Sequence, residues 1–173
     1  MRTFISIKLS TKALMCVKDI QEKLPSFNGR KTELKNLHLT LKFLGEVPSE
    51  KLEEIKSKLS SIKFSKFEAE IKECDFFDKQ ERGIIWLGIT NCENLQKEID
   101  NSLKGIYEKE KRFMGHLTIA RTKKILNKKK FTDDLKKINI PNMFFIVDKF
   151  YLMESDLKKE GPEYKIIGEY PLN

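Results

Sequence analysis

The chain has 173 residues, of which 39% are hydrophobic, so it fits one folded domain rather than a disordered segment. Its formal net charge of +8 fits an anionic partner, although lysine-rich surfaces also serve solubility alone. Only two histidines and three cysteines are present, without C-x-x-C spacing, which argues against a metal centre and a disulfide framework. No apolar run approaches the ~18 residues of a membrane span and no signal peptide is evident, so we expect a cytoplasmic protein without membrane contact. We also expect it to be a monomer.

Alternating apolar positions, capping residues and turn residues predict strands and helices in a regular order. In chain order these are a strand over 3–9, a helix over 11–24 capped by Thr11, a strand over 37–44, a helix over 49–62, strands over 67–77 and 83–90 joined by a polar turn at 78–82, a helix from 91–93 to 106, a strand over 116–121, a helix over 133–138, a strand over 143–153, a turn at 158–162 and a strand over 164–170.

A similar run of strands and helices occurs twice, which indicates an internal duplication. We therefore expect an α+β fold of two pseudo-symmetric lobes, each with an antiparallel sheet flanked by helices, around a central cleft. No linker rich in Pro, Gly or Ser divides the lobes, so residues 1–173 are predicted to form a single domain of two intertwined lobes.

Both histidines begin the same four-residue pattern. His38-Leu39-Thr40-Leu41 lies in one predicted strand and His116-Leu117-Thr118-Ile119 in another. Residues i and i+2 share a face of a strand, so each imidazole lies beside a hydroxyl while the apolar residues point into the core. A lone histidine in such a strand is more often structural, but two in duplicate settings favour a shared site.

The same alternation assigns a face to the neighbouring residues. The inward set is Leu37, Leu39, Leu41 and Phe43, and the set on the other face is His38, Thr40 and Lys42. Lys42 is therefore a candidate phosphate-binding cation, with a solvated charge as the alternative. Arg121 is a second candidate, but strict alternation puts it opposite His116, so it reaches the site only if the strand twists or ends there.

Paired histidines and threonines suit in-line displacement at a cyclic phosphodiester. The reaction needs a base on the attacking oxygen and an acid on the leaving oxygen, and histidine, with an ordinary pKa of about 6.5, serves both roles. Hydroxyl groups and a cation stabilise the negative charge of the transition state. This chemistry requires no metal ion or other cofactor.

Two further features have both a functional and a structural interpretation. Lys123-Lys124 and Lys128-Lys129-Lys130 either bind RNA phosphates or form a solvated loop, and we expect the loop. Trp86 is expected in the core, with a base-stacking platform as the alternative.

The two motifs resemble those of the 2H phosphoesterase superfamily, and the chain is similar to its RNA 2′,3′-cyclic phosphodiesterase family, historically called 2′-5′ RNA ligase. Residues 36–45 resemble the family's first block, 113–121 its second, 2–7 its opening strand and 152–172 its close. The likeness covers nearly the whole chain. One departure is Met114-Gly115 before His116, where the family commonly has a basic residue and proline, so we expect a looser start to this strand.

The resemblance implies a bilobal LigT-like fold and metal-independent hydrolysis of RNA 2′,3′-cyclic phosphate ends, tRNA-like or other, to 2′-phosphomonoesters. It implies that His38 donates a proton to the departing 3′ oxygen and that His116 activates water. Thr40, Thr118 and Arg121 would hold the phosphate. Run in reverse, the same geometry would form a 2′-5′ RNA linkage, with hydrolysis expected to dominate in water.

The residues themselves leave two alternatives open. One is a phosphoesterase acting on 2′-5′ oligonucleotides or a small cyclic phosphate, and the other is a non-catalytic module that binds RNA ends. By residue type alone, the two histidines are interchangeable as acid and base.

Overall fold

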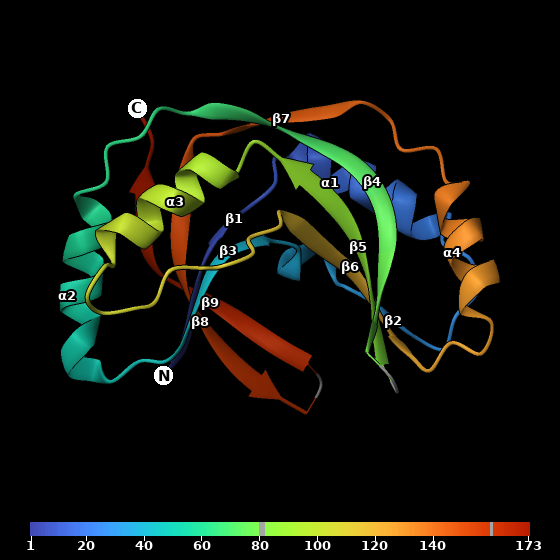
Figure 1. The fold of residues 1–173 in the computed structure, drawn as a ribbon, viewed down its shortest axis with the longest axis horizontal. Coiled ribbons are helices and arrows are strands. Elements are labelled where there is room, and N and C mark those ends of the chain that lie inside the picture. The colour runs from blue at the N-terminus through green and yellow to red at the C-terminus, as the bar shows by residue number, and fades with distance from the viewer. Residues whose placement is uncertain (80–81, 160) are drawn as a thin grey trace.

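The computed structural model describes residues 1–79, 82–159 and 161–173, and within them nine strands form one curled antiparallel sheet (Figure 1). The order across the sheet is β7-β4-β5-β6-β3-β1-β8-β9, and β2 also pairs with β6. The strands are β1 (Arg2–Ile7), β2 (Gly29–Lys31), β3 (Leu39–Glu46), β4 (Phe67–Lys79), β5 (Arg82–Thr90), β6 (His116–Lys123), β7 (Met143–Val147), β8 (Lys149–Lys158) and β9 (Gly161–Pro171).

The two motif strands, β3 and β6, are neighbours at the centre of the sheet. They pair through Leu39 opposite Leu117. On one side β6 continues into β5, β4 and β7, and on the other β3 continues into β1, β8 and β9. The predicted α+β fold with two antiparallel halves is therefore confirmed, and the two histidine motifs lie where the halves meet.

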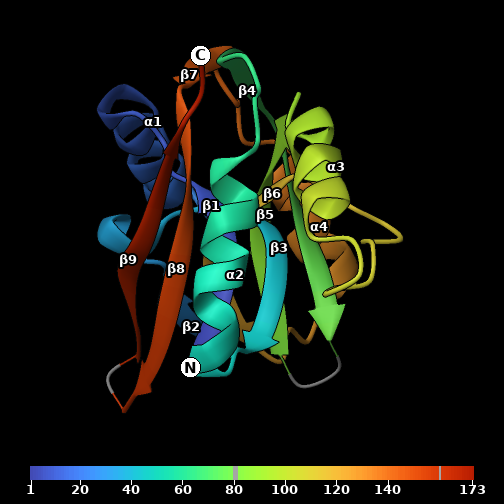
Figure 2. The ribbon, with the colours of Figure 1, turned by 90° about the vertical axis from the view of Figure 1, so that its left-hand side faces the viewer.

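In the described part of the chain, four α-helices and one short 3-10 helix accompany the sheet (Figure 2). They are α1 (Thr11–Glu22), η1 (Leu34–Asn36), α2 (Ser49–Ser60), α3 (Glu93–Ser102) and α4 (Lys128–Lys136). Apolar side chains recur at helical spacing, so α1 and α3 bury a stripe that shares one core cluster with Leu39 and Leu117. This packing reserves the opposite face of β3 and β6 for the histidines.

Several boundaries differ from the sequence prediction. Ser10 rather than Thr11 caps α1, because its hydroxyl accepts the hydrogen bond from the Ala13 backbone N–H. The Asn127 side chain similarly caps α4, so Lys128–Lys130 form its first turn rather than a loop.

The remaining differences concern strands and turns. The strand predicted over 143–153 is two strands separated at Asp148, and part of the loop before the first motif forms β2. In the predicted turns, residues 80–81 and 160 lie outside the described residues.

All three cysteines are buried and unpaired, as expected. Within residues 1–79, 82–159 and 161–173, no helix is long and apolar enough to cross a membrane.

Candidate active site

The pairing of Leu39 with Leu117 determines how the four motif side chains meet. In an antiparallel ladder, one step on either side of this pair places His38 opposite Thr118 and Thr40 opposite His116. These four residues are half-buried and lie on the face opposite the two leucines. We call this side of the sheet the histidine face. Each imidazole therefore has a hydroxyl of its own motif on one side and a hydroxyl of the other motif across from it.

Both imidazoles are held by the same backbone contact. His38 Nδ1 lies 2.7 Å from the Asn36 carbonyl oxygen, and His116 Nδ1 lies 2.9 Å from the Met114 carbonyl oxygen. A carbonyl oxygen only accepts hydrogen bonds, so Nδ1 carries the proton and donates in both rings. Nε2 is then the atom of each ring that gains or loses a proton.

An aromatic pair packs against each histidine. His38 meets the Tyr164 ring edge-on, with centroids 4.9 Å apart, and the Phe4 ring at 4.8 Å. His116 meets Phe77 edge-on at 5.6 Å and Trp86 at 6.5 Å. The rings fix the imidazoles in place and shield them from water. Sequence reasoning missed the partners of His38, because Phe4 and Tyr164 lie far from it along the chain.

This packing affects the charge state of His38. Burial disfavours the imidazolium and lowers the pKa of His38 below its ordinary value, and the nearby cations Arg121 and Lys8 act in the same direction. The hydrogen bond with Asn36 opposes this shift only in part. In the unliganded protein the neutral form of His38 is therefore favoured at neutral pH.

A β-bulge in β6 brings Arg121 to the histidine face. Trp86 pairs with Thr118 and the preceding residue of β5, Ile85, pairs with Ala120, so Ile119 is an extra residue in β6. The alternation therefore shifts by one, and Arg121 points to the same side as Thr118. Strict alternation would put Arg121 on the face opposite His116, and this one extra residue brings it to the same face instead.

Comparison with known proteins agrees with this geometry. An RNA 2′,3′-cyclic phosphodiesterase of Methanocaldococcus jannaschii is 34% identical over 175 residues, covering 98% of this chain and all of the relative. One from Thermotoga maritima is 34% identical, covering 98% of this chain and 94% of the relative. The family model described as LigT like Phosphoesterase matches residues 10–86. The chain belongs to this LigT-like phosphoesterase family.

Solved structures show the LigT-like fold over almost the entire chain. The crystal structure of E. coli LigT complexed with 3′-AMP superposes with a TM-score of 0.80 at 22% sequence identity, covering 99% of this chain and 98% of that one. A crystal structure from Thermus thermophilus gives a TM-score of 0.79 at 24% identity, covering 99% of this chain and 97% of that one.

The prediction for Lys42 is wrong for this LigT-like chain. In β3 the residue Leu41 is extra, because Ser6 pairs with Thr40 and the preceding Ile5 pairs with Lys42. The bulge turns Lys42 into the interior and brings Phe43, which was expected inward, to the histidine face with 68% exposure. One β-bulge thus places Arg121 of β6 on the histidine face, and the other places Phe43 of β3 there.

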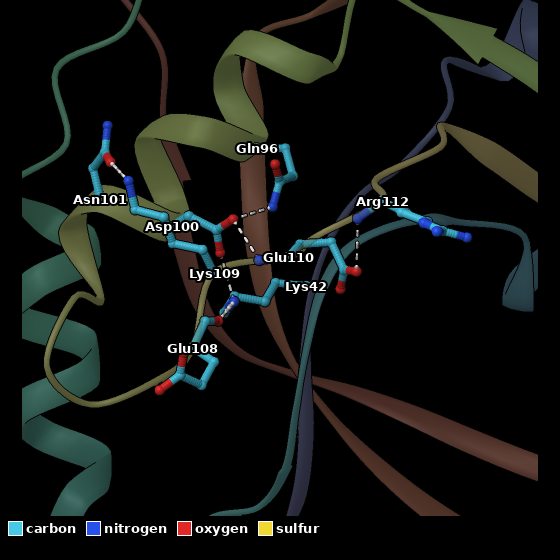
Figure 3. Close-up of polar contacts among 8 residues, drawn as sticks. All are labelled: Lys42, Gln96, Asp100, Asn101, Glu108, Lys109, Glu110 and Arg112. Atoms are coloured by element: carbon cyan, nitrogen blue, oxygen red, sulfur yellow. Dashed lines mark hydrogen bonds and ion pairs between the residues drawn. The ribbon is translucent and has the colours of Figure 1, made fainter.

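Lys42 is instead part of a buried polar network (Figure 3). Its ammonium group lies 2.5 Å from the Asp100 carboxylate and donates to the Glu108 carbonyl oxygen at 2.7 Å. Asp100 also accepts from the Gln96 side chain and the Glu110 backbone N–H. Although burial acts to raise it, these hydrogen bonds hold the pKa of Asp100 below its ordinary value. The network ties β3 and α3 to the segment that leads into His116.

Gln21 supports the bulge of β6 from the other side of the sheet. Its buried side-chain amide donates to the Ile119 carbonyl oxygen at 2.8 Å and to the Thr32 carbonyl oxygen at 2.9 Å. The backbone at the extra residue is therefore satisfied by α1. A buried glutamine in an otherwise apolar helix stripe was the sequence signal that could have identified this contact.

The glycine that replaces the family's common proline has a steric explanation. Gly115 is buried, and the backbone beside β5 is so close that an added Cβ would lie 2.2 Å from the Ile89 carbonyl oxygen. The Gly115 carbonyl oxygen in turn accepts from the Ile89 N–H at 2.9 Å. The start of β6 is thus held tightly against β5, contrary to the looser start that we expected.

The two remaining candidates have clear positions. Trp86 is buried, as expected, and its ring stacks on Phe77 on the histidine face. Lys128 pairs with Asp78, and Lys130 pairs with Asp134. In the part of the chain that the structure describes, no three His, Cys, Asp or Glu side chains are grouped to hold a metal ion.

Proposed function

We propose that this protein hydrolyses RNA 2′,3′-cyclic phosphate ends to 2′-phosphomonoesters. The observation that carries the proposal is the arrangement of two imidazoles, each presenting Nε2, around two threonine hydroxyls on one face of the sheet. The names of the relatives from M. jannaschii and T. maritima support the substrate class.

In the proposed reaction, water attacks phosphorus in line with the bond to the 3′ oxygen. Neutral His116 accepts the proton of water at Nε2, and His38 donates a proton from Nε2 to the departing 3′ oxygen. The new P–O bond to water forms as the bond from phosphorus to O3′ breaks, so the 2′ ester remains. Every proton is accounted for by the two rings, and no metal ion takes part.

The remaining residues stabilise the charge that develops on the non-bridging oxygens. The hydroxyls of Thr40 and Thr118 donate to these oxygens, and Arg121 supplies the positive charge. Since Arg121 sits on an exposed strand position, its guanidinium also meets the substrate as it arrives. The microscopic reverse, attack by a 5′ hydroxyl, would give a 2′-5′ linkage at the same site.

Substrate binding favours the protonated form of His38. The free protein favours neutral His38, whereas an acid catalyst must be protonated. A bound phosphodiester places a negative charge beside the ring, which favours the imidazolium and raises its pKa. The substrate thus converts His38 into the acid that its own cleavage needs.

The three unpaired cysteines support a reducing compartment, so we place this reaction in the cytoplasm.

The test is incubation of a short RNA ending in a 2′,3′-cyclic phosphate with the protein in excess EDTA. We expect ³¹P NMR to show only the 2′-phosphate, and His38→Ala and His116→Ala to lose at least ~100-fold in rate. Leu126→Ala, at a position with 93% exposure, is the matched control and should retain full activity. Unchanged substrate with the wild-type protein, or equal turnover in both histidine variants and the wild type, would refute the proposal.

A further inference from the structure

Beyond Arg121, the histidine face carries a second set of cations toward the end of the β4–β5 hairpin. Lys123 pairs with Arg82 across β6 and β5, and Arg82 pairs with Lys79 across β5 and β4. Directly opposed residues of antiparallel strands share a face, so these three side chains form one row across the sheet. We call Lys79, Arg82 and Lys123 the distal basic row.

The distal basic row is on the same face as the catalytic histidines. Phe77 packs on His116 and is two residues before Lys79 in β4. Lys123 follows Arg121 by two residues in β6, after the bulge has set the alternation. Two residues of a strand span about 7 Å, so the distal basic row lies that far beyond Arg121, along the strand direction.

The charges of this row are available to a partner. Lys79, Arg82 and Lys123 are exposed, and among the described residues none of them is in a salt bridge. The acidic residue next to them, Asp78, lies on the opposite face, where it pairs with Lys128 of α4. A solvated lysine surface normally alternates with acidic residues, but this row joins three cations to Arg121 without a described carboxylate between them.

The other side of the site carries charges of both signs. Beyond Tyr164, which contacts His38, lies a hollow of about 580 Å³ between the start of β1 and the β8–β9 hairpin. Four carboxylates line it, namely Glu46, Glu154, Asp156 and Glu163, together with Arg2, Lys165 and the N-terminal ammonium group of Met1, which pairs with Glu46. Figures 1 and 2 both show the lower parts of strands β4 and β5 apart from those of strands β8 and β9. A polyanion leaving the site therefore meets only cations among the described residues of the distal basic row, whereas on the β8–β9 side the basic groups are offset by carboxylates, including Glu163, which pairs with Lys158.

From this asymmetry we infer that the distal basic row binds backbone phosphates of the RNA strand on the 5′ side of the cyclic end. The inference rests on the proposed function and adds a direction to it: the RNA runs from Arg121 along β6 toward the end of the β4–β5 hairpin. The preferred substrate is accordingly an oligonucleotide of several residues, because a mononucleotide cyclic phosphate reaches only the catalytic histidines, the threonines and Arg121.

The experiment compares a six-nucleotide RNA ending in a 2′,3′-cyclic phosphate with a 2′,3′-cyclic mononucleotide. The variant is the triple substitution Lys79→Ala, Arg82→Ala and Lys123→Ala. The matched control removes the same charge from exposed positions of α1 and α2, with Lys12→Ala, Lys18→Ala and Lys51→Ala. For each protein, kcat/KM is measured over a range of salt concentrations, and RNA affinity is measured by fluorescence anisotropy.

We expect the row variant to lose at least ~10-fold in kcat/KM and affinity for the oligonucleotide at low salt. The slope of log affinity against log salt should become shallower by about 2, since each single-strand phosphate contact contributes about 0.7. Turnover of the mononucleotide should stay within about twofold, as should all values of the control protein. Oligonucleotide values of the row variant equal to those of the control would overturn the inference.

Anisotropy separates this inference from the proposed function. If no cyclic phosphate is hydrolysed but the row variant still loses RNA affinity, the proposed reaction fails and the distal basic row stands. If hydrolysis is confirmed but the RNA affinity of the row variant is unchanged, the reaction stands and the row is refuted. Circular dichroism of both triple variants checks that the sheet is intact.

Discussion

Replacing Lys42 by methionine tests whether this residue stabilises the buried network rather than binds phosphate in the site. Lys42 and Asp100 are both 5% exposed, and the ammonium group satisfies the carboxylate and the Glu108 carbonyl oxygen together. Lys42→Met keeps the volume of the side chain but leaves a buried carboxylate without its countercharge. Breaking a buried pair in this way costs about 3–5 kcal/mol.

The expected change can be measured as a shift of the melting temperature. For a chain of 173 residues, the average unfolding entropy converts this cost to a fall in Tm of about 8–14 °C. Differential scanning calorimetry of Lys42→Met and of Lys42→Met combined with Asp100→Leu provides the assay. The double variant removes both charges, so it should recover at least half of the lost Tm. The exposed pair of Lys130 and Asp134 supplies a control, in which Lys130→Met should leave Tm unchanged within error.

The pH dependence of the same variant follows from the lowered pKa of Asp100. A carboxyl group whose folded pKa is depressed contributes stability above its unfolded pKa of about 3.9, and this contribution is lost as pH falls through the folded pKa. The difference in Tm between wild type and Lys42→Met should therefore shrink below about pH 4. A Lys42→Met protein that melts within about 2 °C of wild type at pH 7 would refute the reasoning, as would a much larger loss of kcat than of stability.

Three further predictions concern the site itself. The chain has two histidines, so an NMR titration resolves both rings, and we expect the pKa of His38 to lie below about 6.5 because the ring is buried beside cations. Lys8→Met should raise the pKa of His38, and Lys12→Met should leave it unchanged. A His38 that titrates at its ordinary pKa would contradict the burial argument. Thr118→Val should lower kcat about 100- to 1,000-fold while Thr118→Ser keeps most of it, and equal activity of the two variants would remove the hydroxyl from the mechanism. Gly115→Ala should lower both Tm and kcat because the added Cβ would lie 2.2 Å from the Ile89 carbonyl oxygen. Gly88→Ala should be tolerated because its Cβ meets only the flexible Glu73 side chain, at 3.3 Å. Equal Tm values of the two variants in calorimetry would show that β5 and β6 can move apart at Gly115 without cost.

The sequence was informative about the motifs because strand alternation is a local rule. It predicted the strands of both histidines, the face shared by each His and Thr, and the α+β class. It was wrong for Lys42 and Phe43, and it placed Arg121 on the far face, for one reason: an extra residue at Leu41 or Ile119 reverses alternation. Such bulges are determined by cross-strand pairing, which is not visible in a single strand.

Contacts between residues far apart in the sequence could likewise not be predicted. The ring of Tyr164 approaches His38 only after β1, β3, β8 and β9 have assembled, and Gln21 finds its carbonyl partners only when α1 crosses β6. The helix α4 was predicted too short because lysines suggested a solvated segment, whereas the cap at Asn127 starts the helix earlier.

The pairing of Leu39 with Leu117 has a mechanical consequence. Each half of the molecule carries one histidine, and the two halves join at the centre through this contact between β3 and β6. The core cluster behind this pair, together with the ion pair of Lys42 and Asp100, sets how far apart the two halves hold the imidazoles. Substitutions in this packing, far from either histidine, are therefore expected to change the separation of the two imidazoles while both histidines and both threonines stay the same.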